Sequence, residues 1–297
     1  MNQELKVLFN NYIIEKKQYH TESTHINANE AYAPIIKCLI DLGINTTDDL
    51  KFEDGIRIFN WFDQNSCVKN TTKNKYMGYI KAVLRHHGYL SHPYLLVKKL
   101  PNDVEPYKPV DRELFDSIIE YAANKDTHVN DWIYYAVFVI MYDTACRIRE
   151  LLTIKKQNII ISTNTIILEN KDTKGRTQRF VFFTDSKKDL LRDMIKQTPS
   201  EYIFWNYSKQ RKLTENDVRN YIRRIKKKLN IDVFHPHQVR KLSATDLVVA
   251  GANLKTAQTI LGHKEQKTTE LYINYTALVA KQEYDKFRNN QKSSLKK

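Results

Sequence analysis

Apolar residues recur three and four positions apart through most of the first hundred residues, which is the spacing of one face of a helix. The segments 30–44, 54–64 and 73–90 show this pattern most clearly, and strand-like alternation is scarce among them. We therefore expect residues 1–99 to form a helical domain.

The pattern changes in the second half of the chain. Short Ile- and Phe-rich runs at 158–162, 165–170 and 179–183 are separated by polar turns, which predicts a small antiparallel sheet whose second and third strands form a hairpin. An 11-residue apolar run from Trp132 to Tyr142 is too short to cross a bilayer and predicts a buried helix. After Asp185 the pattern is helical again to the end.

Prolines mark the boundary between the two halves. Three of the chain's 7 prolines lie within 100–110, and proline removes a backbone donor and disfavours helix at the residue before it. The chain is therefore expected to contain a domain at 1–99, a linker at 100–110 and a second domain at 111–297. The predicted fold class is mainly α with a small antiparallel β-sheet.

Charge narrows the class of partner. Lys and Arg total 48 against 34 Asp and Glu, and the net charge of +14 is spread along the chain, which favours a polyanionic partner contacted by the whole molecule. A helix in the first domain combines lysines with aromatic side chains, a mixture that suits contact with a phosphate backbone, although each residue could equally belong to a solvated face. These candidate DNA-binding residues are Lys73, Lys75, Lys81 and Arg85.

Cysteine usage and the N-terminus add little chemistry. The three cysteines match no metal-ligand spacing, so no metal site is predicted and reduced thiols in a cytoplasmic protein are expected. The first residues carry acids and lack the apolar core of a signal peptide, and no membrane association is expected.

Two segments around the predicted sheet carry side chains suited to chemistry. Arg147 and Glu150 lie three apart near a helix start, and Lys171 and Lys174 lie in the turn of the predicted hairpin. An arginine or a lysine in such a place is, taken alone, usually a solvated or ion-paired side chain.

A third segment follows at 235–251. Pro236 suits the first turn of a helix, which places His237 and Arg240 on one face and lets Gly251 end the helix. In a fourth segment, Asn253 can cap a helix that stops at Gly262. Each of these features alone is a common structural element.

The final candidates follow that last helix. His263 comes directly after its stop, and Tyr272 lies nine residues later. The chain has 18 tyrosines, and most of them must serve packing or the surface.

Together these motifs resemble the tyrosine recombinase (phage integrase) family, including the Xer-type enzymes. The family pattern is Arg-x-x-Glu-Leu, a lysine on a β-hairpin, His-x-x-Arg, Leu-Gly-His and Thr-Thr-x-x-Tyr, and all five occur here in that order between residues 107 and 280. The sequence departs from the family where a usual glycine is Ala145, a frequent proline is Phe182 and a frequent histidine is Lys241.

The resemblance implies a two-domain DNA clamp, with a helical (SAM-like) core-binding domain and a catalytic domain whose C-terminal tail docks on a neighbouring protomer. It also implies a role for each matching residue. Two arginines bind the scissile phosphate, one histidine acts as base, the second histidine donates to a phosphate oxygen, the tyrosine is the nucleophile and a glutamate orients its neighbours. The two arginines are Arg147 and Arg240, the base is His237, and the second histidine is His263. The nucleophile is Tyr272, and the orienting glutamate is Glu150.

A lysine on the hairpin is the implied general acid. Family members commonly carry it five residues before an arginine that opens the third strand, and counting back from Arg179 selects Lys174, with Lys171 as the alternative.

The implied activity is site-specific recombination through a 3′-phosphotyrosine and a Holliday junction. It would be performed without cofactor by a homotetramer on two duplex DNA sites, at the nucleoid, with an accessory or directionality protein as a further partner. Two other readings stay open: a type IB topoisomerase that relaxes supercoils, and a non-catalytic DNA-binding regulator on the same fold.

Overall fold

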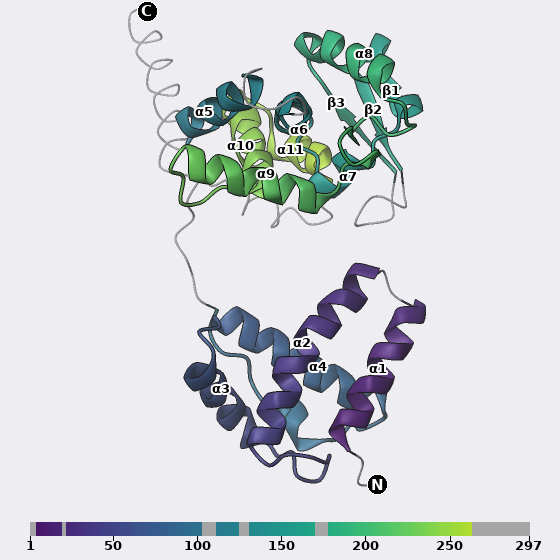
Figure 1. The fold of residues 1–297 in the computed structure, drawn as a ribbon. Coiled ribbons are helices and arrows are strands. Elements are labelled where there is room, and N and C mark those ends of the chain that lie inside the picture. The colour runs from purple at the N-terminus through teal and green to yellow at the C-terminus, as the bar shows by residue number, and fades with distance from the viewer. Residues whose placement is uncertain (1–3, 20–21, 103–110, 125–130, 170–177, 263–297) are drawn as a thin grey trace, which may run out of the picture. The chain divides into compact units, whose positions relative to one another are not determined.

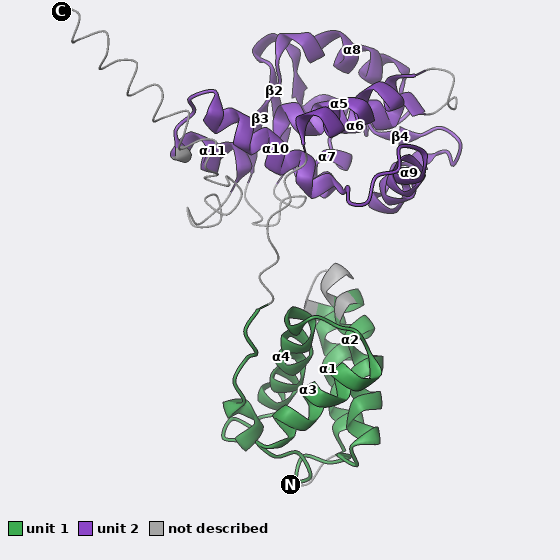
Figure 2. Cartoon of the chain, turned by 90° about the vertical axis from the view of Figure 1, so that its left-hand side faces the viewer, with its two compact units in different colours: residues 1–107 green, residues 108–297 purple. Residues whose placement is uncertain are grey.

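The computed structural model describes residues 4–19, 22–102, 111–124, 131–169 and 178–262 (Figure 1). The chain divides into two compact units, residues 1–107 and 108–297 (Figure 2). The division falls within the predicted linker 100–110, most of which lies outside the described residues.

The first unit is helical in all its described elements, as the spacing of its apolar residues predicts. Its core is formed by one face of each helix, and Val83, Leu84 and Tyr94 are fully enclosed. A short 3-10 helix begins where Pro93 occupies its first turn and the His92 ring accepts a hydrogen bond from the Tyr94 amide. The elements are α1 (Leu5–Tyr19), α2 (Glu22–Asp41), α3 (Asp54–Asn65), α4 (Asn70–His86) and η1 (Pro93–Leu96).

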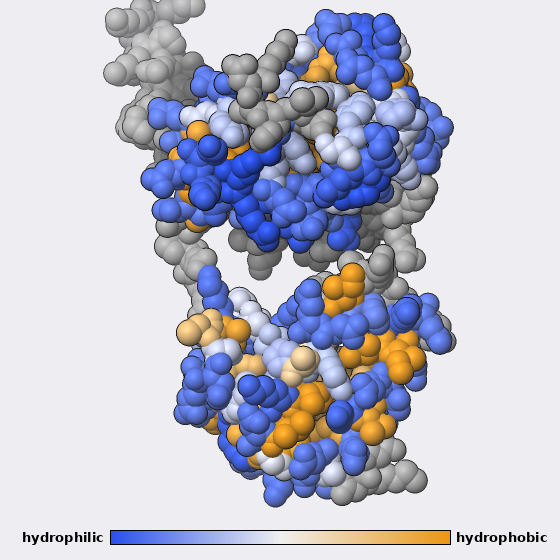
Figure 3. All heavy atoms as spheres, viewed as in Figure 1, coloured by the Kyte–Doolittle hydropathy of each residue, from blue (hydrophilic) through white to orange (hydrophobic). Residues whose placement is uncertain are grey.

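Among the described residues, the first unit has more exposed large apolar side chains than the second. Figure 3 shows these as orange patches among hydrophilic residues, whereas the visible face of the second unit is mainly hydrophilic. The exposed apolar residues of the first unit are Val7, Ile14, Ile26, Ile40, Phe52, Ile56, Leu90 and Leu96.

The second unit is built around α6 (Asp131–Thr144), the predicted buried helix. Ala136, Val137, Phe138 and Ile140 are fully enclosed, because this helix is apolar on nearly every side and is covered by neighbours. It packs against α5 (Arg112–Ala123), whose N-cap is Asp111, and against α10 (Pro236–Val249). The remaining helices are α7 (Ile148–Leu152), α8 (Lys188–Gln197), α9 (Glu215–Lys228) and α11 (Leu254–Leu261), with 3-10 turns η2 (Lys156–Asn158), η3 (Ile161–Thr163) and η4 (Asp185–Lys187).

The predicted three-stranded antiparallel sheet is confirmed. Its order is β1-β2-β3, with β1 at Ile159–Ile160, β2 at Thr165–Leu168 and β3 at Arg179–Phe182. Leu168 pairs with Arg179, so the hairpin loop between β2 and β3 starts and ends at these two residues.

The expectation that the chain is helical throughout after Asp185 is wrong in one place. A second antiparallel pair, β4 (Trp205–Asn206) and β5 (Arg211–Lys212), lies between α8 and α9. Each strand has two residues, which is too short to show an alternating pattern. Its turn contains Gln210 at a φ of 49°, a left-handed backbone conformation that is uncommon for glutamine and that no local sequence pattern predicts.

Two further properties are the absence of a membrane-spanning helix among the described residues and the state of the cysteines. Among the described residues, no helix is both long and apolar enough to span a membrane. All three cysteines are free thiols: Cys38 and Cys146 are buried in the cores of the first and second units, and Cys67 is exposed between α3 and α4.

Candidate active site

Arg147 occupies the N-cap of α7, in agreement with its predicted place at a helix start. Its backbone amide donates to Glu150 Oε2 at 3.0 Å, and its guanidinium Nη1 donates to Glu150 Oε1 at 2.9 Å. The turn that precedes it requires Ala145 to adopt a φ of 52°. This left-handed conformation favours glycine, so it explains why a glycine would suit that position.

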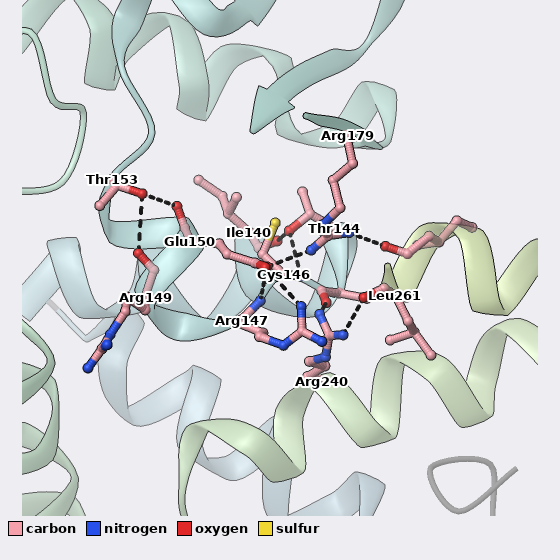
Figure 4. Close-up of polar contacts among 12 residues, drawn as sticks. Ile140, Thr144, Cys146, Arg147, Arg149, Glu150, Thr153, Arg179, Arg240 and Leu261 are labelled. Carbon is pink, nitrogen blue, oxygen red and sulfur yellow. Dashed lines mark hydrogen bonds and ion pairs between the residues drawn. The ribbon is translucent and has the colours of Figure 1, made fainter. Parts of the chain in front are cut away.

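Glu150 is buried, with a side chain that is 1% exposed, and it is shared by two arginines. Besides Arg147, it binds Arg179 of β3, whose Nη2 lies 2.5 Å from Glu150 Oε2 (Figure 4). Burial raises the pKa of Glu150, but the charge of Arg179, the amide of Arg147 and the charge of Arg147 outweigh this effect and lower the pKa overall. The carboxylate is therefore ionised at neutral pH.

Arg240 lies on α10 and is fully buried, although it is the second predicted phosphate ligand. Pro236 lies in the first turn of α10, as predicted, and Arg240 follows one turn later on the same helix. The Arg240 guanidinium donates through Nη1 to the carbonyl of Ala145 and through Nη2 to the carbonyl of Leu261, the latter at 2.5 Å (Figure 4). Arg240 thus joins the turn before α7 to the end of α11.

The predicted limits of α11 are confirmed. The side chain of Asn253 accepts a hydrogen bond from the Thr256 amide at 2.8 Å, and Gly262 ends the helix at a φ of 61°. A Cβ atom at Gly262 would lie 2.8 Å from Arg179 Cδ and 2.9 Å from Arg179 Nε. Glycine is therefore needed there both for its backbone conformation and because the Arg179 side chain passes against it.

His237 lies one turn before Arg240 on α10, as the sequence spacing predicts. Its pKa is lowered from 6.5 to about 4, mainly by partial burial of the ring and then by the charges of Lys241, Arg240, His235 and Arg147. Arg240 lies one turn further along the same helix and donates to the carbonyl of Ala145, two residues before Arg147, so the three residues belong to one strongly positive region. Two guanidiniums and an imidazole of this kind suit a phosphate oxygen.

The neutral state of His237 can be tested directly. In an NMR titration of the free protein, its ring should protonate near the low pKa of about 4 and not near 6.5. Since the unfolded chain binds this proton at higher pH than the folded one, the contribution of His237 to stability is lost as the pH falls from 6.5 towards 4. The variant His237→Gln identifies the resonance, and a midpoint at or above 6.5 would contradict the electrostatic picture.

The four basic residues of the first unit that are predicted to contact DNA differ in their exposure and in their partners. Lys73 is 5% exposed and its Nζ forms an ion pair with Asp63, and Lys81 donates to a backbone carbonyl at the end of η1. These two lysines hold their own unit together, which the sequence pattern did not reveal. Lys75 and Arg85 are exposed on α4. DNA contact stays a prediction for all four.

The remaining predicted residues are not placed. Lys171, Lys174, His263 and Tyr272 lie outside the described residues, and so does the C-terminal tail. One residue that sequence reasoning used only as a register mark, Arg179, proves to be part of the site through its contact with Glu150.

Comparisons with known proteins bear on the family and on the fold of the chain. The phage integrase family matches the chain over residues 108–278. A probable integrase/recombinase of Acholeplasma phage L2 is 26% identical over 285 residues, covering 96% of this chain and 97% of the relative. Tyrosine recombinase XerA of Saccharolobus solfataricus is 34% identical over 154 residues, 52% of this chain and 50% of the relative.

Solved structures share the fold at low sequence identity. The Tn1549 transposon integrase in complex with circular intermediate DNA has a TM-score of 0.75 at 18% identity, covering 91% of this chain and 95% of that one. A lambda integrase tetramer bound to a Holliday junction has a TM-score of 0.72 at 16% identity, covering 91% of this chain and 77% of that one.

Proposed function

This chain belongs to the phage integrase family, and on that premise we propose that it cleaves and rejoins duplex DNA at a specific site through a covalent bond between Tyr272 and a 3′-phosphate. The observation that carries the proposal is that Arg240, one turn after His237 on α10, donates to the carbonyl of Ala145 two residues before Arg147, which brings the two arginines of the family motifs to one turn.

Phosphate chemistry explains the need for two arginines. Attack on a phosphodiester gives a five-coordinate intermediate with added negative charge on its non-bridging oxygens. Guanidiniums bind such oxygens through paired hydrogen bonds, and fixed donors of this kind commonly contribute ~3 kcal/mol each in the transition state. Arg147 is 27% exposed and accessible to a ligand, whereas Arg240 works from a buried position between two carbonyls.

The other roles are proton transfers. A phenol has a pKa of roughly 10, so Tyr272 needs a base, and the lowered pKa of His237 keeps that ring free of a proton at neutral pH. We assign to His263 a hydrogen bond to a non-bridging oxygen. The departing 5′ oxygen needs an acid, for which Lys174 is the choice and Lys171 the alternative.

The proposed chemistry also bears on how copies of the protein assemble on DNA. A phosphotyrosine preserves the energy of the broken bond, so rejoining needs neither ATP nor a metal. We propose that four copies act on two DNA sites through a Holliday junction, supported by the likeness to a lambda integrase tetramer bound to such a junction. The tail beyond Tyr272 would dock on a neighbouring protomer. The proposed location is the nucleoid in the cytoplasm. An accessory or directionality protein is the remaining proposed partner.

One experiment separates this function from the alternatives. The full chain is incubated in EDTA with genomic DNA fragments, and detergent-resistant protein–DNA adducts are mapped to find the site. A synthetic Holliday junction carrying that site should then be resolved, while a supercoiled plasmid lacking it stays supercoiled. Relaxation of that plasmid as fast as of a plasmid that carries the site would favour a topoisomerase. Specific DNA binding without any adduct would favour a non-catalytic regulator.

A further inference from the structure

Arg179 connects three segments of the site. It opens β3 and is 12% exposed, and its guanidinium binds Glu150 on α7 through Nη2. Through Nη1 it donates to the carbonyl of Ile260, near the end of α11 (Figure 4). The same side chain lies against Gly262, where a Cβ atom would clash with it.

The charges around Glu150 show what this connection does. A buried carboxylate that binds Arg147 alone would form a neutral pair with it, and a neutral pair attracts a phosphate weakly. Arg179 supplies a second positive charge to the same carboxylate, so the three groups together carry a net charge of one positive unit. This positive charge is available to a ligand at Arg147, because Arg147 is the more exposed of the two arginines, at 27% against 12%.

We infer that Arg179 is a positioning residue that keeps Arg147 electrostatically available to the scissile phosphate and holds the end of α11 beside it. The inference rests on the proposed function. Satisfying Glu150 does not require Arg179, since the Arg147 amide and guanidinium already donate to both carboxylate oxygens. The main effect of the contact with Arg179 is therefore on the net charge of the site, because both Glu150 oxygens already accept hydrogen bonds from Arg147.

The bond to Ile260 adds a geometric effect. Arg240 binds the next carbonyl, that of Leu261, so two arginines from different elements hold consecutive carbonyls at the end of α11. This end leads directly into His263 in the sequence. Arg179 thus helps to fix the point from which the next catalytic segment starts.

The test compares three variants with the wild type: Arg179→Lys, Arg179→Gln, and Arg179→Gln combined with Glu150→Gln. Adduct formation is measured in a single turnover on nicked duplex DNA at saturating concentration, and DNA affinity and thermal stability are measured alongside. The matched control is Arg192→Gln on α8, where an exposed arginine pairs with Asp189 at 2.7 Å in an i,i+3 contact.

Each variant has its own expected rate. Arg179→Gln leaves Glu150 to neutralise Arg147 and should slow adduct formation by about 10–100-fold, as the loss of groups behind a catalytic residue commonly does. DNA affinity should change little, because Arg179 is largely buried. Arg179→Lys keeps the charge and should retain most of the rate. The double variant removes the carboxylate that would neutralise Arg147 and should react faster than Arg179→Gln, while the control should match the wild type.

Two results would overturn the inference. A double variant as slow as Arg179→Gln, or a lysine variant equally slow, would mean that Arg179 acts through packing alone. If Arg179→Gln fails to fold, the lysine and double variants are compared with the wild type instead, and a loss of about 10-fold or more in both would overturn the inference. Failure of the wild type to form any adduct would instead refute the proposed function.

Discussion

Tyr272→Phe is expected to abolish the covalent protein–DNA adduct and to leave DNA binding intact. The substitution removes one oxygen and almost no volume, so folding and the surrounding contacts should survive. Tyr272 is the tyrosine of the Thr-Thr-x-x-Tyr motif and lies nine residues after the histidine of Leu-Gly-His. The measurement is a detergent-boiled gel of protein and labelled site DNA, with a mobility-shift assay of the same preparation.

The neighbouring tyrosine provides the matched control. Tyr275 lies three positions further along, and Tyr275→Phe makes the same chemical change in the same segment. It should form the adduct at close to the wild-type rate. An adduct that persists in Tyr272→Phe and disappears in Tyr275→Phe would move the nucleophile to Tyr275.

Arg147→Lys and Arg240→Lys should each slow DNA cleavage by roughly 100-fold or more, the cost typical of removing a fixed donor to a transition-state oxygen. Lysine keeps the charge but loses the planar, forked arrangement of donors. The two variants should nevertheless differ in stability. Arg147 is 27% exposed, and a lysine there can reach solvent.

Arg240→Lys should also destabilise the fold. Arg240 is fully buried and donates to the carbonyls of Ala145 and Leu261, which one lysine cannot satisfy in the same geometry. Leaving one buried carbonyl unpaired costs ~1–3 kcal/mol. Each kcal/mol lowers the melting temperature of a domain of this size by about 2–4 °C.

The control for both arginine variants is Arg149→Lys. Arg149 lies two positions after Arg147 in the sequence but is 61% exposed and pairs with Glu215, so cleavage and melting temperature should stay near wild type. Near-normal cleavage by either Arg147→Lys or Arg240→Lys would show that the phosphate is bound by another arginine. An unchanged melting temperature for Arg240→Lys would show that the two carbonyls find other donors.

Helix limits could be predicted from the sequence because they depend on local backbone requirements. Proline lacks an amide and suits a first turn, which placed the start of α10 at Pro236. Asparagine caps a helix and glycine adopts a left-handed conformation, which placed α11 between Asn253 and Gly262. The three-stranded sheet could also be predicted from the sequence, because apolar residues are concentrated in its strands.

Contacts between distant segments could not be predicted in this way. Arg179 and Glu150 are 29 positions apart, and no periodicity links a strand residue to a short helix that precedes it. Lys73 showed the opposite problem, since its position on a basic helix suggested solvent and DNA, whereas the fold turns it inward to Asp63. The charge pattern identifies a basic helix but does not say which face is covered.

The distribution of free thiols makes this protein suitable for site-selective labelling as it stands. Burial raises the pKa of Cys38 to about 12 and also raises that of Cys146, so neither offers the thiolate that alkylating reagents attack. Cys67 is exposed, and it lies on the first unit outside both hydrophobic cores. A maleimide dye should therefore attach at one place without any cysteine being added or removed. Its fluorescence would report on the surroundings of the first unit as the protein meets DNA, in the same molecules whose cleavage is being followed.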